Sequence, residues 1–266
     1  MRKKIHCISI FTKHGNDEAS KVSILLKEKL IENGFAVVDY LSNKDQIVEN
    51  AYKIDLVIAV GGDGTALRTF RTLNYDIPVL SINAGGTRGI LSEISKDNAT
   101  SIIPYLLDGN YYFDNRIRIL AQIDEKLFYH ALNDFVLVRT DITKTPTFHF
   151  SLCGDSFSQK MDGMIISTPT GSTGHSLSIG GPILHENLDC MLITPVASIN
   201  RIPSFVISGT DKLDLQINYN TNLIIDGQQI KEIPKNEKIY ISRYQHDAVF
   251  LRLNKNKLRQ MNKLGY

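Results

Sequence analysis

The sequence has few cysteines, no long hydrophobic run and no excess of one charge. Cys7, Cys153 and Cys190 lie far apart in the chain and form no Cys-x-x-Cys pair, which is typical of core thiols in a reducing compartment. No apolar stretch approaches the length of a membrane span, and the basic N-terminus lacks the apolar core of a secretory signal. We therefore expect a cytoplasmic protein with no membrane partner.

The charge balance argues against nucleic acid as a partner. The chain has 30 Lys and Arg residues against 28 Asp and Glu residues, so no overall field concentrates it on nucleic acid. It also has no internal repeat and no low-complexity linker. Its 266 residues, 42% of them hydrophobic, can bury a real core as one large domain or two smaller ones. A small-molecule partner is the default expectation.

The first part of the chain has the pattern of an α/β domain. Up to about residue 110, short apolar runs alternate with helical periodicity, which is typical of βαβ units around a parallel sheet. The run "LVIAV" at residues 56–60 predicts a central strand covered on both faces. Asn16 or Asp17 can cap the helix that ends at Asn33-Gly34. Residues 1–110 are expected to form one α/β domain.

Beyond residue 110 the pattern changes to period-two alternation. The odd-numbered residues from Ile117 to Ile123 are all apolar, so one strand presents a single apolar face. Turn signals such as Asp226-Gly227 recur between short strands, which predicts antiparallel sheets packed as a sandwich. We expect a β domain over residues 111–247, followed by a C-terminal segment over residues 248–266 whose last part, residues 255–266, is helical.

A glycine-rich turn contains one carboxylate. The stretch "AVGGDGTALRTF", Ala59 to Phe70, surrounds Asp63 with three glycines between the expected central strand and a helix. Glycines let a ligand approach the main chain, and ligands of open α/β sheets bind beyond the carboxyl ends of the strands. Amides at a helix start attract phosphate, whereas a carboxylate repels it unless it holds a metal or takes a proton from a nucleophile. This combination predicts phosphoryl transfer.

The turn also has a simpler explanation, and two nucleotide-binding motifs are excluded. Taken alone, "GGDGT" is explained as well by a tight connection in which an Asp or a Thr caps the helix. It is not a dinucleotide fingerprint, because Leu67 stands where G-x-G-x-x-G requires its third glycine. No G-x-x-x-x-G-K-[ST] occurs anywhere, which excludes Walker-type nucleotide binding.

Two further stretches carry polar groups where a core would be apolar. The residues from Thr168 to Thr173 are mostly hydroxylic, with Gly180-Gly181 after them, and such a loop suits the hydroxyl and phosphate groups of a nucleotide. Asn133-Asp134 interrupts an apolar run, which a β-bulge or a strand end would also explain.

These stretches together resemble the ATP-NAD kinase family, in its compact prokaryotic form. "GGDGT", "LND", "DG…STPTGST…GGP" and "DGQ" at residues 226–228 follow the family's order over about residues 55 to 230. "GGDGT" also occurs in lipid kinases, but "STPTGST" separates the two groups. The resemblance implies a Rossmann-like N-terminal domain, a β-sandwich NAD-binding domain, and a C-terminal segment that packs back on the first domain. It also implies a homodimer or homotetramer.

The resemblance further implies a role for each matching residue. Asp63 would take the proton of the adenosine-ribose 2′-hydroxyl of NAD as that hydroxyl attacks the γ-phosphate of ATP. Mg2+ or another divalent cation would have mostly phosphate oxygens and water as its ligands, and the donor would be ATP or inorganic polyphosphate. The implied NAD-binding residues are Gly62, Gly64, Asn133, Asp134, Lys160, Asp162, Thr170, Gly174, His175 and Ser178. The candidate phosphate contacts are Arg68 and Arg88.

Some positions differ from the family pattern. His175 replaces a tyrosine and is expected to fill the same pocket wall, Arg88 and Ile90 occupy positions that are usually apolar and aromatic, and Asp134 replaces a glutamate. A non-catalytic NAD or NADP sensor is the alternative from another class of function. A lipid kinase is the other alternative, although the chain has no basic amphipathic anchor.

Overall fold

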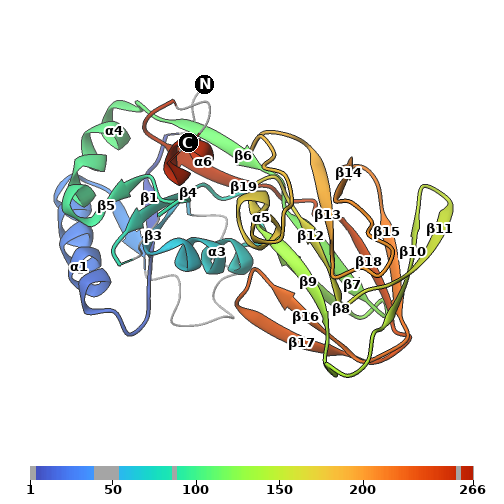
Figure 1. Cartoon of the computed structure of the whole chain (residues 1–266). Helices are drawn as coiled ribbons and strands as arrows, with labels where there is room; N and C mark the ends of the chain where they lie inside the picture. The colour runs from blue at the N-terminus through green and yellow to red at the C-terminus, as the bar shows by residue number, and fades with distance from the viewer. Residues whose placement is uncertain (1–3, 39–53, 86–88, 256–258, 266) are drawn as a thin grey trace. The chain divides into compact units, whose positions relative to one another are not determined.

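The computed structural model describes residues 4–38, 54–85, 89–255 and 259–265. The chain divides into two compact units (Figure 1): unit 1 comprises residues 1–115 and 248–266, and unit 2 comprises residues 116–247. The C-terminal segment thus belongs to unit 1, which confirms that the chain returns to its first domain.

Unit 1 is built on a largely parallel sheet. Its strands are β1 (Cys7–Thr12), β2 (Ala36–Val38), β3 (Leu56–Gly61), β4 (Val79–Asn83), β5 (Ile94–Ser95), β6 (Tyr112–Arg116) and β19 (Ala248–Arg252). Its helices are α1 (Asp17–Glu32), α3 (Asp63–Thr72), the 3-10 helix η2 (Lys96–Ser101), α4 (Ile102–Asp108) and α6 (Arg259–Leu264). The strand order is β2-β1-β3-β4-β19-β6, with β5 paired to β4. The pairs among β1, β2, β3 and β4 are parallel, as the βαβ pattern predicts.

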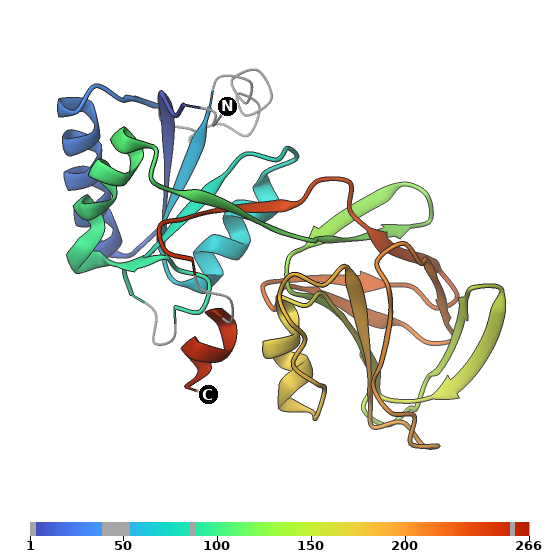
Figure 2. The same ribbon diagram turned by 90° about the horizontal axis from the view of Figure 1, so that it is seen from above.

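The sequence pattern accounts for these elements. All six residues of β3 are buried, because helices cover both faces of the sheet. Figure 2 shows α1 and α4 on one face and α3 on the other. Helix α1 begins after Asn16, whose Oδ1 accepts a hydrogen bond of 2.8 Å from the Ala19 amide. It ends before Gly34, which adopts a φ of +84° that favours glycine.

Unit 2 consists of two antiparallel six-stranded sheets. One has the order β11-β10-β15-β18-β7-β8 and the other has the order β14-β13-β12-β9-β16-β17. The strands of the first sheet are β7 (Ile119–Ile123), β8 (Leu127–Ala131), β10 (Thr147–Leu152), β11 (Asp155–Lys160), β15 (Leu213–Ile217) and β18 (Lys238–Arg243). Those of the second are β9 (Asp134–Arg139), β12 (Gly163–Ser167), β13 (Cys190–Val196), β14 (Phe205–Ser208), β16 (Thr221–Ile225) and β17 (Gln229–Ile233). The short helices η3 (Gly171–Thr173) and α5 (His175–Ser178) follow β12.

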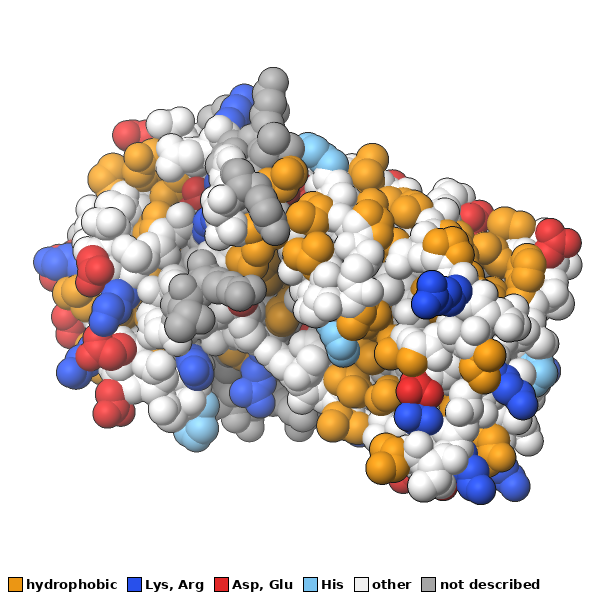
Figure 3. All heavy atoms as spheres, viewed as in Figure 1, with side chains coloured by type: hydrophobic (Ala, Val, Ile, Leu, Met, Phe, Trp, Pro, Cys, Tyr) orange, Lys and Arg blue, Asp and Glu red, His pale blue; other side chains and the backbone are white. Residues whose placement is uncertain are grey.

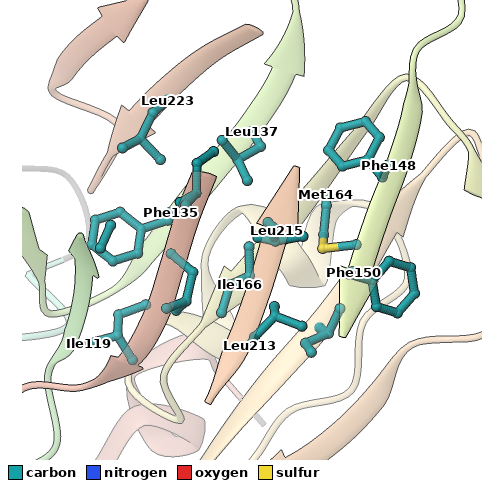
Figure 4. Close-up of a cluster of buried hydrophobic side chains, with 14 of the residues drawn as sticks. Ile119, Phe135, Leu137, Phe148, Phe150, Met164, Ile166, Leu213, Leu215 and Leu223 are labelled. Carbon is teal, nitrogen blue, oxygen red and sulfur yellow. The ribbon is translucent and has the colours of Figure 1, made fainter. Parts of the chain in front are cut away.

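Side chains from both sheets form one core, which confirms the sandwich. Ile119 and Phe148 come from the first sheet, and Phe135 and Ile166 come from the second; all four are fully buried (Figure 4). The period-two pattern holds in β7, where the odd-numbered residues are buried and the even-numbered ones are half-buried. Burial of alternate residues on facing sheets is the usual source of stability in such a fold.

The surface agrees in part with the expectations from composition. On the face drawn in Figure 3, basic and acidic side chains are interspersed. In the part of the chain that the structure describes, no helix combines the length and the apolar character that crossing a bilayer requires. All three thiols are free, but only Cys190 is buried; Cys7 is half-buried and Cys153 is exposed. The prediction of three core thiols was therefore wrong, because Cys153 occupies the exposed β10–β11 turn with a φ of +53°.

Candidate active site

The glycine-rich turn joins β3 to α3 over a single residue. A Cβ on Gly61 would lie 2.2 Å from Thr65 Oγ1, so the first glycine is required by this close approach. Gly62 stands at the N-cap of α3 and has no side chain with which to cap the helix. The turn is tight, as its simplest explanation requires, but the N-cap position is occupied by Gly62 rather than by Asp63 or Thr65. The Asp63 carboxylate is left for another partner.

That partner is the loop after the neighbouring strand. Asp63 Oδ2 accepts a hydrogen bond of 2.8 Å from the Ile90 amide, and Oδ1 accepts one of 2.9 Å from the Leu91 amide. The contact arises because β3 and β4 are adjacent and parallel, so the segments that follow them meet at one edge of the sheet. The half-buried carboxylate is thereby fixed in one orientation, while Gly64 beside it is exposed.

The structure describes one of the two candidate phosphate contacts, Arg68. Arg68 is exposed on α3. It lies five residues after Asp63, which places it about 140° further around the helix axis. The helix therefore points these two side chains in different directions. Arg88 lies outside the described residues.

Three turns meet at one end of the second sheet in unit 2. Strand β9 lies between β12 and β16, with Asp134 opposite Ser167 and Phe135 opposite Ile225. Because both pairs are antiparallel, the start of β9 lies beside the ends of β12 and β16. The turn with Asn133, the turn after Ser167 and the turn at Asp226 consequently come together. The register thus explains why motifs far apart in the sequence share one place.

Backbone hydrogen bonds hold the three turns to one another. The Thr168 amide donates to the Asn133 carbonyl at 2.9 Å. The Asn133 amide donates to Asp226 Oδ1 at 2.7 Å, and the Asp226 amide donates to the Asp134 carbonyl at 3.0 Å. A Cβ on Gly171 would lie 2.0 Å from the Asn133 carbonyl oxygen, so only glycine fits between the two chains. We call Asn133, Asp134, Asp226 and the turn 168–174 the turn cluster.

The turn cluster contains an unusual carboxyl group and an unused acceptor. Asp134 is only 4% exposed, and its burial, with the negative charge of Asp226 as the smaller cause, raises its pKa to about 7. Asn133 Oδ1 is buried and accepts no hydrogen bond from the described part of the chain. Buried acceptors are nearly always paired, so this oxygen is suited to a ligand donor.

Other predicted residues lie in or near the turn cluster. Thr170 is buried within the turn after β12. A Cβ on Gly174 would lie 3.9 Å from Asp134 Oδ2, so this glycine borders the carboxyl group. His175 and Ser178 are exposed on α5, and Ser178 Oγ donates to the Gly174 carbonyl at 3.3 Å.

Lys160 and Asp162 are not brought into the turn cluster. They precede β12, whereas the cluster follows it, so the five residues of β12 separate them. At about 3.3 Å per residue, that strand is roughly 17 Å long. Lys160 is exposed, and Asp162 Oδ2 forms an ion pair of 2.8 Å with Arg139 Nη2.

Sequence reasoning missed two parts of this arrangement. It treated Asp226 as a turn residue within a motif, whereas the Asp226 carboxylate anchors the chain that carries Asn133. It also gave no role to the amides of Ile90 and Leu91, which hold Asp63. The glycine segment before Ile90 was the available signal, since Gly89 has a φ of +57°. A sequence pattern describes side chains, whereas these contacts are made by main-chain amides.

Solved structures of similar fold support the architecture described above. The structure of yeast NADH kinase complexed with NADH superposes with a TM-score of 0.85 at 19% identity, covering 99% of this chain and 87% of that chain. An NAD kinase from Archaeoglobus fulgidus in complex with ATP gives a TM-score of 0.78 at 23% identity, covering 98% and 97%. Likeness at these identities establishes the fold.

Sequence comparisons establish the family. The ATP-NAD kinase N-terminal domain matches residues 11–111, and the ATP-NAD kinase C-terminal domain matches residues 132–253. The NAD kinase of Pyrococcus furiosus is 30% identical over 261 residues, which cover 92% of this chain and 94% of that protein. The NAD kinase of Buchnera aphidicola is 33% identical over 264 residues, which cover 91% and 90%. The chain therefore belongs to the ATP-NAD kinase family and is a kinase.

Proposed function

We propose that the protein transfers the γ-phosphate of ATP to the 2′-hydroxyl of the adenosine ribose of NAD, giving NADP. The observation that carries this proposal is the Asp63 carboxylate, which two backbone amides fix at the carboxyl end of β3. The related structures that contain ATP and NADH support these two classes of ligand. The remaining steps follow from the chemistry of the residues.

Asp63 acts as the general base in this mechanism. Each of its oxygens accepts one amide hydrogen bond, and a carboxylate oxygen has a second lone pair available. That lone pair takes the proton of the 2′-hydroxyl as the hydroxyl oxygen attacks the γ-phosphorus, whose bond to the β–γ bridging oxygen breaks and releases ADP. Holding the base in one orientation lowers the entropic cost of reaching the transition state.

The start of α3 provides the environment for the donor phosphates. The positive end of a ten-residue helix attracts negative charge, and the exposed Gly64 gives phosphate room to approach. No cluster of three or more His, Cys, Asp or Glu side chains suited to a metal occurs among the described residues. We assign Mg2+ to phosphate oxygens and water, a coordination that suits this ion, and there it neutralises phosphate charge.

The turn cluster binds the adenosine part of NAD. Asn133 Oδ1, a buried acceptor, receives a hydrogen bond from the adenine amino group, and Thr170 supplies a second contact to the base. Asp134 accepts a hydrogen bond from a ribose hydroxyl, with Gly174 leaving the space beside it open. Burial of the polar groups favours a ligand that satisfies them over water.

Lys160 and Asp162 serve the same substrate from a different copy of the chain. The length of β12 separates them from the turn cluster of their own chain. A homodimer or homotetramer, which the family resemblance implies, lets the strand end of one copy complete the site of another. His175 and Ser178, both exposed on α5, border that site.

The experiment is an assay of NADP formation by the purified protein. NAD, ATP and Mg2+ are supplied, and NADP is detected with an NADP-specific dehydrogenase; inorganic polyphosphate replaces ATP in a parallel reaction. Continuous NADP production supports the proposal, and the better donor identifies the phosphate source. Tight NADP binding without turnover on either donor would overturn it and favour a dinucleotide sensor.

A further inference from the structure

The loop that holds Asp63 is itself held by the C-terminal segment. The amides of Ile90 and Leu91 point to the Asp63 carboxylate. On the carbonyl side of the loop, Lys263 Nζ of α6 donates to the Gly89 carbonyl at 2.7 Å and also to the Ser92 carbonyl. One ammonium group therefore spans the loop from residue 89 to residue 92.

The Lys263 ammonium and the Asp63 carboxylate share one peptide group. The Gly89 carbonyl, which accepts from Lys263, and the Ile90 amide, which donates to Asp63, belong to the same peptide bond. A cation at the oxygen of a peptide polarises it and makes its N–H a stronger donor, since linked hydrogen bonds strengthen one another. Lys263 thus influences Asp63 without touching it.

Buried ion pairs fix the segment that carries Lys263. Glu93, directly after the loop, pairs with Arg259 Nη1 at 2.9 Å and with Arg252 Nη1 at 3.4 Å. Its side chain is 1% exposed, and its Oε1 also accepts the Leu253 amide at 3.0 Å. Arg252 Nη1 donates in addition to the Leu91 carbonyl at 2.9 Å. These contacts place α6 against the loop.

The charged groups around Lys263 have opposite effects on its pKa. Burial is the largest influence and lowers its pKa to about 8, with the positive charges of Arg259 and Arg252 acting in the same direction. The negative charges of Glu93 and Asp63 act in the opposite direction. An ordinary lysine keeps its charge to a much higher pH.

We propose that Lys263 is a positioning residue for the phosphoryl transfer, and that its charged form holds the loop 89–92 in the conformation that orients Asp63. This inference rests on the proposed function for its catalytic part. It goes beyond that function by giving the returning C-terminal helix a part in the reaction. It requires no contact between Lys263 and substrate.

The test compares three variants of the full-length protein. Lys263→Met removes the charge and keeps most of the aliphatic side chain, Lys263→Arg keeps a permanent charge, and Lys255→Met removes an exposed charge of the same segment. For Lys263→Met we expect kcat to fall about tenfold, with the KM values for NAD and ATP within about twofold of the original. Lys263→Arg should restore most of the loss, and Lys255→Met should match the unaltered protein.

A pH profile distinguishes positioning from a loss of stability. In the unaltered protein kcat should decline as the pH rises through about 8, because the Lys263 ammonium loses its proton. Lys263→Met should lack this decline, and Lys263→Arg should shift it to higher pH, since a guanidinium stays charged. Unchanged kcat and an unchanged profile in Lys263→Met would overturn the inference.

Hydrogen exchange separates this inference from the proposed function. The amides of Ile90 and Leu91 should exchange about tenfold faster in Lys263→Met than in the Lys255→Met control, whether or not the protein makes NADP. An unaltered protein without kinase activity would overturn the proposed function and, with it, the catalytic part of the inference. An active protein whose Lys263→Met variant exchanges and turns over normally would overturn the inference alone.

Discussion

Replacement of Asp63 by asparagine tests the base and its support together. Asp63→Asn removes the negative charge and leaves one acceptor oxygen, so one of the two amides, at Ile90 or Leu91, faces an NH2 group. A donor that loses its acceptor in a half-buried place costs about 1–3 kcal/mol of folding free energy. That cost is small beside the total stability of a domain of this size, so we expect the variant to fold.

The effect on catalysis is expected to be larger than the effect on stability. A general base contributes about 10²–10⁴-fold to a rate, which corresponds to about 3–5 kcal/mol in the activation free energy. We therefore expect the kcat of Asp63→Asn to fall by about 100-fold or more, with the dissociation constant for NAD nearly unchanged. The assays are steady-state NADP formation, NAD binding by calorimetry and thermal unfolding.

A matched control separates the loss of the base from the loss of a backbone acceptor. Asp141 Oδ1 accepts the Thr143 amide at 2.8 Å in an exposed loop of unit 2, so Asp141→Ala removes a backbone acceptor away from the candidate site. Its turnover should stay within about twofold of the unaltered protein. A folded Asp63→Asn protein that turns over as fast as this control would refute the assignment of Asp63 as the base.

Three further predictions concern stability. Because the folded-state pKa of Asp134 is raised to about 7, the free energy of unfolding should fall as the pH rises from about 4 to about 7. Asp134→Asn should remove this part of the pH dependence. Urea unfolding at pH 5 and pH 8 measures the change in stability, and a stability that rises with pH would contradict the prediction. Gly171→Ala should lower the free energy of unfolding by about 2 kcal/mol or more and weaken NAD binding, because the alanine Cβ would lie 2.0 Å from the Asn133 carbonyl oxygen. An unchanged melting temperature and unchanged NAD binding would argue against the close packing of the turn cluster. Glu93→Gln should lower the free energy of unfolding by about 3 kcal/mol, because the buried Arg259 loses its counter-charge and the buried Arg252 keeps only Asp114. Glu32→Gln, at an exposed ion pair, should lower it by less than about 1 kcal/mol. Equal effects of the two variants in denaturant unfolding would contradict the buried ion-pair assignment.

Local pattern predicted the parts of the fold that depend on local physics. The apolar run of β3 and the cap at Asn16 are properties of a few consecutive residues, and both are found in the structure. The period-two pattern from Ile117 to Ile123 likewise predicted the sandwich, because alternation is what a half-buried strand requires.

Contacts between distant segments could not be predicted in the same way. Ile90 lies 27 residues after Asp63, and Lys263 lies 174 residues after Gly89. No periodicity links such pairs; they meet because β3, β4 and the C-terminal segment belong to one unit. The resemblance to the family named Asp63 but could not identify the atoms that orient its carboxylate.

Strand length explains why neighbours in the sequence can be separated in space. Asp162 and Thr168 belong to one motif, yet the whole of β12 lies between them. Helix geometry likewise separates Arg68 from Asp63. The two residues are five positions apart on α3, so their side chains point in different directions from the helix axis. Both conclusions follow from simple geometry once the type of element is known.

The most direct test of the central claim is the position of the transferred phosphate. The purified protein is incubated with NAD, ATP and Mg2+, and the product is analysed by proton–phosphorus correlation in NMR. We predict that the new phosphate couples to the 2′ proton of the adenosine ribose. A phosphate on any other hydroxyl, or ATP hydrolysis without transfer to NAD, would contradict the account.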